Sequence, residues 1–216
     1  MKHLITLGRS FILVILCSCG PTIYKSTLMD TAIAKHKIVA IIPADVNIKL
    51  RPNEAKKATP EDIAKSEEST GFAIQDKMYS WFLKRSEKYS YTVKFQDVSK
   101  TNALLKEAGI SYIDLRTKDK TELAKLLGVD AVISSLTRLD KPMSEGASVA
   151  LGILFGFWGS TNKANVTINI HEAEKGDLIW KYDYEAAGSV GSSADNLVNA
   201  LMRNASKKFP YNSKGD

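Results

Sequence analysis

The chain has 216 residues, of which 44% are hydrophobic and 25% are charged, which suits one globular domain with a normal core and excludes intrinsic disorder. The formal net charge is +6, but lysines and carboxylates are interleaved without a long run of like charges. Binding of a nucleic acid usually requires a clustered basic face, so we expect that this protein has no nucleic-acid partner. The mild basic excess indicates solubility or weak attraction to anionic lipid head groups.

The first residues have the layout of a secretory signal. A basic start with Lys2 and Arg9 precedes a short apolar core, Phe11 to Leu16, which is too short for a membrane span of about 17 to 25 residues. The sequence Leu16-Cys17-Ser18-Cys19 that follows resembles the lipobox of bacterial lipoproteins. This resemblance implies that residues 1–18 are a signal peptide and that Cys19 carries a diacylglyceryl group and an acylated amino group. An ordinary signal peptide, or a buried strand with two core cysteines, is the alternative.

The lipobox has consequences for compartment and anchoring. Cys17 and Cys19 are the only cysteines, so the mature chain would keep only the lipidated one and form no internal disulfide. Two or more acyl chains, such as palmitate, anchor a protein stably. Gly20 stands where an Asp favours inner-membrane retention in Gram-negative lipoproteins. The resemblance therefore implies the outer membrane and its periplasmic face. Residues 19–36 show no clear period and are expected to form a lipid tether.

The domain is expected over residues 37–211. The apolar run Ile38 to Ile42 predicts a strand covered on both faces, and Pro43 limits its pairing. Thr59 and Pro60 predict the start of a helix that continues to about Lys88. This helix has an apolar stripe at spacings of three and four, formed by Gly71, Ile74, Met78, Trp81 and Phe82. Further elements are expected over 91–95 (strand), 99–108 (helix), 119–128 (helix) and 130–139 (strand).

The second half of the domain predicts a hairpin and a last helix. Residues 166–170 alternate apolar and polar, and a turn at Lys175-Gly176 leads into a second alternating stretch, 177–185. The last helix is capped at Ser192 and Asp195 and ends before Pro210. Residues 212–216 form a tail. This order predicts an α/β (α+β) single-domain sandwich in which helices cover a mixed sheet.

Three stretches of the domain resemble a known group of proteins: "KIVAIIPA", "LAKLLGVDAVISSLTRL" and "VTINIHEAEKGDLIWKYDYEAAGS". They are similar to small periplasm-facing lipoproteins, including the curli-secretion lipoprotein CsgG, the penicillin-binding-protein activator LpoB and meningococcal-type outer-membrane lipoproteins. The resemblance implies a fold like the TolB amino-terminal and anticodon-binding domains. It also implies an accessory or assembly role, with self-association or an envelope protein partner, rather than an enzyme. No clear counterpart of the long pore-forming hairpins of CsgG is present.

Residues that could support catalysis are scattered. The three histidines, His3, His36 and His171, have no paired spacing, so no metal site is predicted and no cofactor is expected. The stretch "GSVGSSADN", residues 188–196, lacks the Gly-Lys-Ser/Thr ending of phosphate-binding loops, and a turn with a helix cap explains it. A periplasmic enzyme with an unrecognised site is the alternative, and it predicts a polar, charged pocket.

The uncharged stretch "GASVALGILFGFWGS", residues 146–160, lies within an apolar insertion, 144–162. It is short for a membrane span, and its glycines are costly in a regular core helix. On a helix the four-residue spacing of Ser148, Gly152 and Gly156 forms one smooth strip. A membrane or oligomer contact is therefore expected at Ser148, Leu151, Gly152, Phe155, Gly156, Phe157 and Trp158. The alternatives are a core flap, a spanning segment, and a subunit of an outer-membrane pore or secretion complex.

Overall fold

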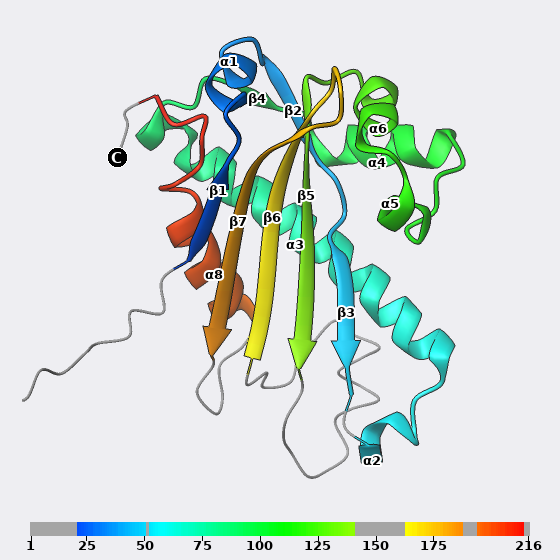
Figure 1. Ribbon diagram of the computed structural model, residues 1–216. Coiled ribbons are helices and arrows are strands. Elements are labelled where there is room, and N and C mark those ends of the chain that lie inside the picture. Colours follow the sequence, from blue (N-terminus) through cyan, green and yellow to red (C-terminus); the bar gives the residue numbers. More distant parts are fainter. Residues whose placement is uncertain (1–20, 51, 141–162, 188–193, 214–216) are drawn as a thin grey trace, which may run out of the picture.

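The computed structural model describes residues 21–50, 52–140, 163–187 and 194–213 (Figure 1). These residues form a seven-stranded mixed sheet with strand order β1-β7-β6-β5-β2-β4, and β3 also pairs with β5. The strands are β1 (Thr22–Lys25), β2 (Ile38–Ile41), β3 (Asp45–Lys49), β4 (Lys94–Phe95), β5 (Ala131–Asp140), β6 (Lys163–Glu172) and β7 (Leu178–Ala187). The helices are α1 (Met29–Ile33), α2 (Pro52–Ala55), α3 (Pro60–Tyr89), α4 (Val98–Glu107), α5 (Asp114–Thr117), α6 (Lys120–Leu127) and α8 (Ala194–Ala205).

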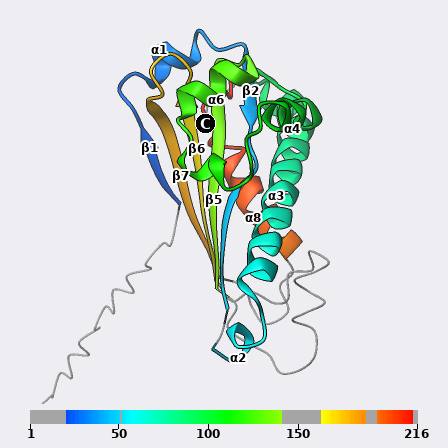
Figure 2. The same ribbon diagram turned by 90° about the vertical axis from the view of Figure 1, so that its right-hand side faces the viewer.

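Helices cover the two faces of the sheet unequally. Successive strand residues point to opposite faces, and the buried ones separate into two clusters. Val39 and Ile41 belong to the larger cluster, with residues of α3 and α8, whereas Ala40 and Ile42 belong to the smaller one, with residues of α4, α5 and α6. Figure 2 shows α3 and α8 together on one side of the sheet. The fold is therefore a single α/β (α+β) domain, as the sequence predicts.

The helix boundaries follow the sequence signals. Thr59 forms a complete capping box with Asp62 at the start of α3, which satisfies backbone N–H groups left free by the first turn. Asp119 caps α6 by accepting hydrogen bonds from the N–H groups of Thr121 and Glu122. Gly128 ends α6 with φ +65°, a conformation that costs a residue with a side chain about 1–2 kcal/mol.

Besides β3 and α2, which were not predicted, three stretches differ from the expectation. The tether expected over 19–36 contains β1 and α1, and β1 pairs along β7; a strand this short shows no period because its contacts come from a distant partner. The strand expected over 91–95 is only Lys94–Phe95, since Tyr91 instead bridges to Asn212. The third difference is α5, a short helix that was not predicted.

Candidate functional site

The residues predicted to contact a membrane or partner lie outside the described residues. They are Cys19 and the set Ser148, Leu151, Gly152, Phe155, Gly156, Phe157 and Trp158. The structure does describe where their segments join the sheet. Asp140 at the end of β5 pairs with Lys163 at the start of β6, and Lys163 pairs with Ala187 at the end of β7. We call this end of the sheet, defined by Asp140, Lys163 and Ala187, the anchor end.

The amino-terminal strand also starts toward the anchor end. Thr22 lies opposite Asp183 and Lys25 lies opposite Trp180. Because β1 is antiparallel to β7, Thr22 is the residue of β1 nearest the carboxyl end of β7 (Figure 1). Cys19 precedes Thr22 by three residues in the sequence.

A bulge separates β2 from β3, and both strands run parallel to β5. Ile41 pairs with Ile133, but Asp45 pairs with Leu136, so three residues, 42–44, lie opposite two residues of β5. One extra residue in one strand is a β-bulge. Pro43 lies within it and has no N–H to donate to a ladder. The extra residue turns the side chains of Asp45 and Ile42 toward the same face of the sheet.

Helix α3 packs closely against this bulge at Gly71. The Ala44 N–H donates a hydrogen bond to the Gly71 carbonyl at 3.1 Å. A Cβ at position 71 would meet the Ala44 carbonyl oxygen and would lie 2.6 Å from Cε2 of Tyr112. Glycine is therefore required here by the close approach of two backbones, and not by a left-handed conformation.

The Tyr112 hydroxyl also contacts the bulge, next to Gly71. It donates toward the Ala44 carbonyl at 2.8 Å and the Glu67 carbonyl at 3.1 Å, and it accepts a hydrogen bond from the Val46 N–H at 3.0 Å. Burial raises the pKa of Tyr112. The neutral phenol is thus both donor and acceptor for backbone groups that no strand satisfies.

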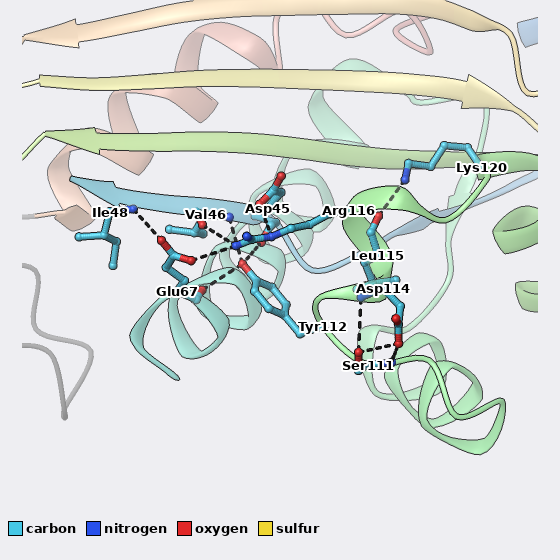
Figure 3. A network of polar contacts seen from close by, with 11 residues as sticks. Asp45, Val46, Ile48, Glu67, Ser111, Tyr112, Asp114, Leu115, Arg116 and Lys120 are labelled. Atoms are coloured by element: carbon cyan, nitrogen blue, oxygen red, sulfur yellow. Dashed lines mark hydrogen bonds and ion pairs between the residues drawn. The ribbon is translucent and has the colours of Figure 1, made fainter. Parts of the chain in front are cut away.

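Two charged side chains continue this pattern along β3 (Figure 3). Arg116 Nη2 donates to the Val46 carbonyl and to Glu67 Oε2, both at 3.0 Å, and Arg116 Nε lies 2.9 Å from Asp45 Oδ1. Glu67 Oε1 accepts from the Ile48 N–H at 3.0 Å. These bonds occupy the outer edge of β3, which would otherwise offer free N–H and C=O groups to another strand. The network therefore has a structural role, the protection of a sheet edge.

A pocket of about 160 Å³ lies beside this network, between the sheet and the α5–α6 region. Its apolar lining is formed by Ile42, Pro43, Leu115 and Leu136, and its polar lining includes Lys120, Ser134, Asn169 and His171. Asp45 and Arg116 also line it, and their side chains are 37% and 33% exposed. The pocket therefore opens to solvent beside the Asp45–Arg116 ion pair. We call it the bulge pocket.

Burial controls the charges around the bulge pocket. Lys120 Nζ donates to the carbonyls of Leu115 and Lys118, each at 2.9 Å, and burial lowers the pKa of Lys120. Burial, and then the nearby Lys120 charge, lowers the pKa of His171. His171 is therefore a neutral imidazole at pH 7. Its Nδ1 and the Oδ1 of Asn169 are buried and receive no hydrogen bond from the described residues.

A second polar group of residues lies at the end of the sheet opposite the anchor end. His36 Nδ1 lies 2.7 Å from the Tyr211 hydroxyl, and burial lowers the pKa of His36. Asp130 accepts hydrogen bonds from the N–H groups of Lys37 and Ile38, and Glu172 accepts from N–H groups of the turn before β7. A groove of about 520 Å³ runs beside them. Each of these two carboxylates therefore accepts hydrogen bonds from backbone N–H groups.

Within residues 21–50, 52–140, 163–187 and 194–213, no group of three or more His, Cys, Asp or Glu side chains is placed to hold a metal ion. In the same ranges, no helix has the length and apolar character needed to cross a bilayer.

Comparisons with known proteins give fold likenesses only. No family model matches the sequence, and no curated protein matches it. Lipoprotein GNA1162 from Neisseria meningitidis is similar with 11% identity and a TM-score of 0.45, over 80% of this chain and 96% of that chain. The PelC dodecamer from Paraburkholderia phytofirmans is similar with 12% identity and a TM-score of 0.43, over 89% of this chain and 96% of that chain. The LpoB C-terminal domain from Escherichia coli is similar with 11% identity and a TM-score of 0.37, over 74% of this chain and 96% of that chain. With TM-scores below 0.5, these likenesses assign no family and no activity.

Sequence reasoning missed most of the bulge pocket. Tyr112 and Arg116 lie in the α5 region, which shows no helical period, and Lys120 was read only as part of a capped helix. One signal was present in α3: Glu67 stands four residues before Gly71 and so falls on the apolar face of the helix, where a buried carboxylate needs a partner. His171 follows the buried Ile170 and lies on the other face of β6, where Lys120 of α6 lines the same pocket.

Proposed function

We propose that this protein is a lipid-anchored, non-catalytic accessory or assembly protein of the bacterial cell envelope. Cys19 would hold it at the periplasmic face of the outer membrane, and the apolar insertion 144–162 would mediate oligomerisation or docking of an envelope protein. One structural observation supports this proposal most directly. Thr22 is the residue of β1 nearest the anchor end, and Asp140 and Lys163, which flank the segment that contains the insertion, lie at that end.

Thr22 lies only a few residues along the sheet from the anchor end. Thr22 lies opposite Asp183, which pairs with Thr167 on β6, and Thr167 is four residues from Lys163. At about 3.3 Å per residue, Thr167 and the residues paired across from it lie about 13 Å along the sheet from Lys163, the first residue of β6. A lipid on Cys19 would therefore bring the anchor end to the bilayer surface. The insertion that starts there would be concentrated beside the membrane and beside other anchored copies.

The charged residues of the described domain support a non-catalytic role. Arg116 is bonded to both Asp45 and Glu67, and Glu67 and Tyr112 are bonded to the backbone of β3. These groups are committed to structure, whereas a general base needs access to a substrate proton. The bulge pocket is the place where the enzyme alternative would act. However, no described residue donates to or accepts from His171 Nδ1, so a relay that orients this imidazole through Nδ1 is not formed.

The anchor is tested in cells with Cys19→Ser. We expect the variant to lose both palmitate-analogue labelling and membrane association, because the thiol that carries the lipid is gone. Deletion of residues 147–158 is the matched change: it should keep the label and the membrane fraction but lose the self-association or partner binding that the full chain shows. A Cys19→Ser protein with unchanged label and unchanged membrane fraction would overturn the proposal.

The orientation is tested separately with single spin labels on the lipidated protein in vesicles. Arg138 is exposed near the anchor end, and Lys175 is exposed in the turn between β6 and β7 at the opposite end. Labels at Arg138→Cys should be closer to the bilayer than labels at Lys175→Cys. Equal depths, or the reverse order, would show that the anchor end does not face the membrane. A pore subunit, the alternative with the same orientation, also predicts ion conductance in planar bilayers.

A further inference from the structure

We propose that the bulge pocket binds a small neutral molecule with neighbouring hydroxyl groups, such as a polyol or one sugar ring. This binding site goes beyond the envelope role proposed above and does not depend on the lipid anchor. It rests on the volume of the pocket, on its unpartnered polar atoms and on the balance of charges around it.

The polar atoms come from adjacent strands and lie close together. Asn169 and His171 are two residues apart on β6 and therefore point to the same face of the sheet. Ser134 is the direct cross-strand partner of Asn169, which places their Cβ atoms about 5 Å apart. Leaving a buried acceptor such as Asn169 Oδ1 unpaired costs about 1–3 kcal/mol. Both Asn169 Oδ1 and His171 Nδ1 are buried, so a small rotation of each side chain toward the pocket is needed before a ligand hydroxyl can donate to the oxygen and a second hydroxyl can bond to the nitrogen.

Lys120 supplies a further donor at the same pocket. Two of its three N–H groups are directed at the Leu115 and Lys118 carbonyls, so one N–H is left for a ligand oxygen. The lining also contains the apolar side chains of Ile42, Pro43 and Leu136. Such a lining suits the C–H groups of a polyol or sugar ring, since these molecules have polar edges and apolar faces.

The charges favour a neutral ligand. Two cations, Arg116 and Lys120, face two carboxylates, Asp45 and Glu67, in and beside the pocket. An anion at Lys120 would also lie near the Asp45 carboxylate, whose pKa is already raised by burial. A cation would meet Lys120 itself. The volume of about 160 Å³ corresponds to about five water molecules at ~30 Å³ each, which suits a polyol of a few carbons or one sugar ring.

The test is nuclear magnetic resonance of the full-length protein in detergent, with ¹⁵N-labelled histidine. Glycerol and methyl glucoside are the probes, and acetate and inorganic phosphate test the charge preference. We expect a saturable shift of the His171 imidazole with a neutral probe, and no shift of His36, which does not line the bulge pocket. Comparison of glycerol with methyl glucoside distinguishes a polyol from a sugar ring.

Two variants connect the shift to the pocket. Lys120→Met and Asn169→Ala should each weaken binding of the neutral probe several-fold, whereas Lys175→Met, which removes a lysine from the groove beside His36, should leave it unchanged. The His36 resonance reports whether each variant is folded. Water alone in the pocket predicts no saturable shift with either neutral probe, and that result would overturn the proposal. Tighter binding of acetate or phosphate than of the neutral probes would also overturn it.

Discussion

His36 and Tyr211 meet at 2.7 Å although 175 positions separate them in the chain. His36 follows α1 and precedes β2, and Tyr211 belongs to the segment after α8, where Phe209 is also buried. The rings are tilted by 43° with centroids 5.8 Å apart. This hydrogen bond therefore joins the start of the sheet to the end of the chain inside the core.

Stability should fall in mild acid because desolvation lowers the pKa of both described histidines. Burial lowers the folded-state pKa of His36 and His171 from the ordinary value of 6.5. Below that value the unfolded chain binds more protons than the folded chain, so the free energy of unfolding decreases as the pH falls from 6.5 to the folded pKa. Each histidine contributes at most about 1.4 kcal/mol per pH unit. Urea unfolding at a series of pH values measures this slope.

His36→Gln should reduce the pH slope while lowering stability at neutral pH. Tyr211→Phe is the matched control: it removes the hydrogen bond but keeps a titrating, buried imidazole, so the slope should persist. An unchanged slope in the His36→Gln, His171→Gln double variant would contradict the assignment to these two groups.

Tyr112→Phe should destabilise the protein through the bulge alone. The substitution keeps the ring but removes the hydroxyl that contacts the Ala44 carbonyl and the Val46 N–H. Leaving these buried groups unpaired should cost about 1–3 kcal/mol in the free energy of unfolding. Tyr24→Phe provides the control, because Tyr24 is 49% exposed and exposed changes usually stay within about 0.5 kcal/mol. Equal effects of the two variants would refute the role given to Tyr112.

Gly71→Ala should destabilise the protein even though alanine favours helices by about 1 kcal/mol over glycine. The added Cβ would meet the Ala44 carbonyl oxygen and the Tyr112 ring, and overpacking of this kind costs about 1–3 kcal/mol. The reverse change at an exposed position of the same helix, Ala73→Gly, measures propensity without the clash. A stabilised Gly71→Ala protein would show that α3 can move away from the bulge at little cost.

Removal of the side chains that cover β3 should promote association. In the double variant Glu67→Ala, Arg116→Ala, the Val46 carbonyl and the Ile48 N–H lose their partners, and an open strand edge can pair with another chain. We expect faster aggregation, which thioflavin fluorescence and light scattering measure. The matched control removes the exposed Lys118–Glu122 pair, whose atoms lie 2.8 Å apart and which should contribute little. Equal aggregation of the two double variants would argue against edge protection.

Local signals were sufficient for the long helix and the hairpin. Thr59, Pro60 and the stripe from Gly71 to Phe82 predicted α3 because caps and helical spacing act within one element. The alternation of residues 166–170 and 177–185 predicted β6 and β7 for the same reason. The strand β1 escaped prediction because its pairing with β7 joins residues more than 150 positions apart, and no local period reports such a contact.

The sequence by itself determined the fold class, the order of the main elements and the hypothesis of a lipidated Cys19, since each depends on residues that are neighbours along the chain. Only the tertiary structure decided that Thr22, as the residue of β1 nearest the anchor end, and Asp140 and Lys163 lie toward one end of the sheet. It also decided that Asn169, His171 and Lys120 line one pocket beside the bulge at Pro43. The physical reason is that strand register and helix packing bring together side chains from distant segments, and burial then changes their charges and hydrogen bonds.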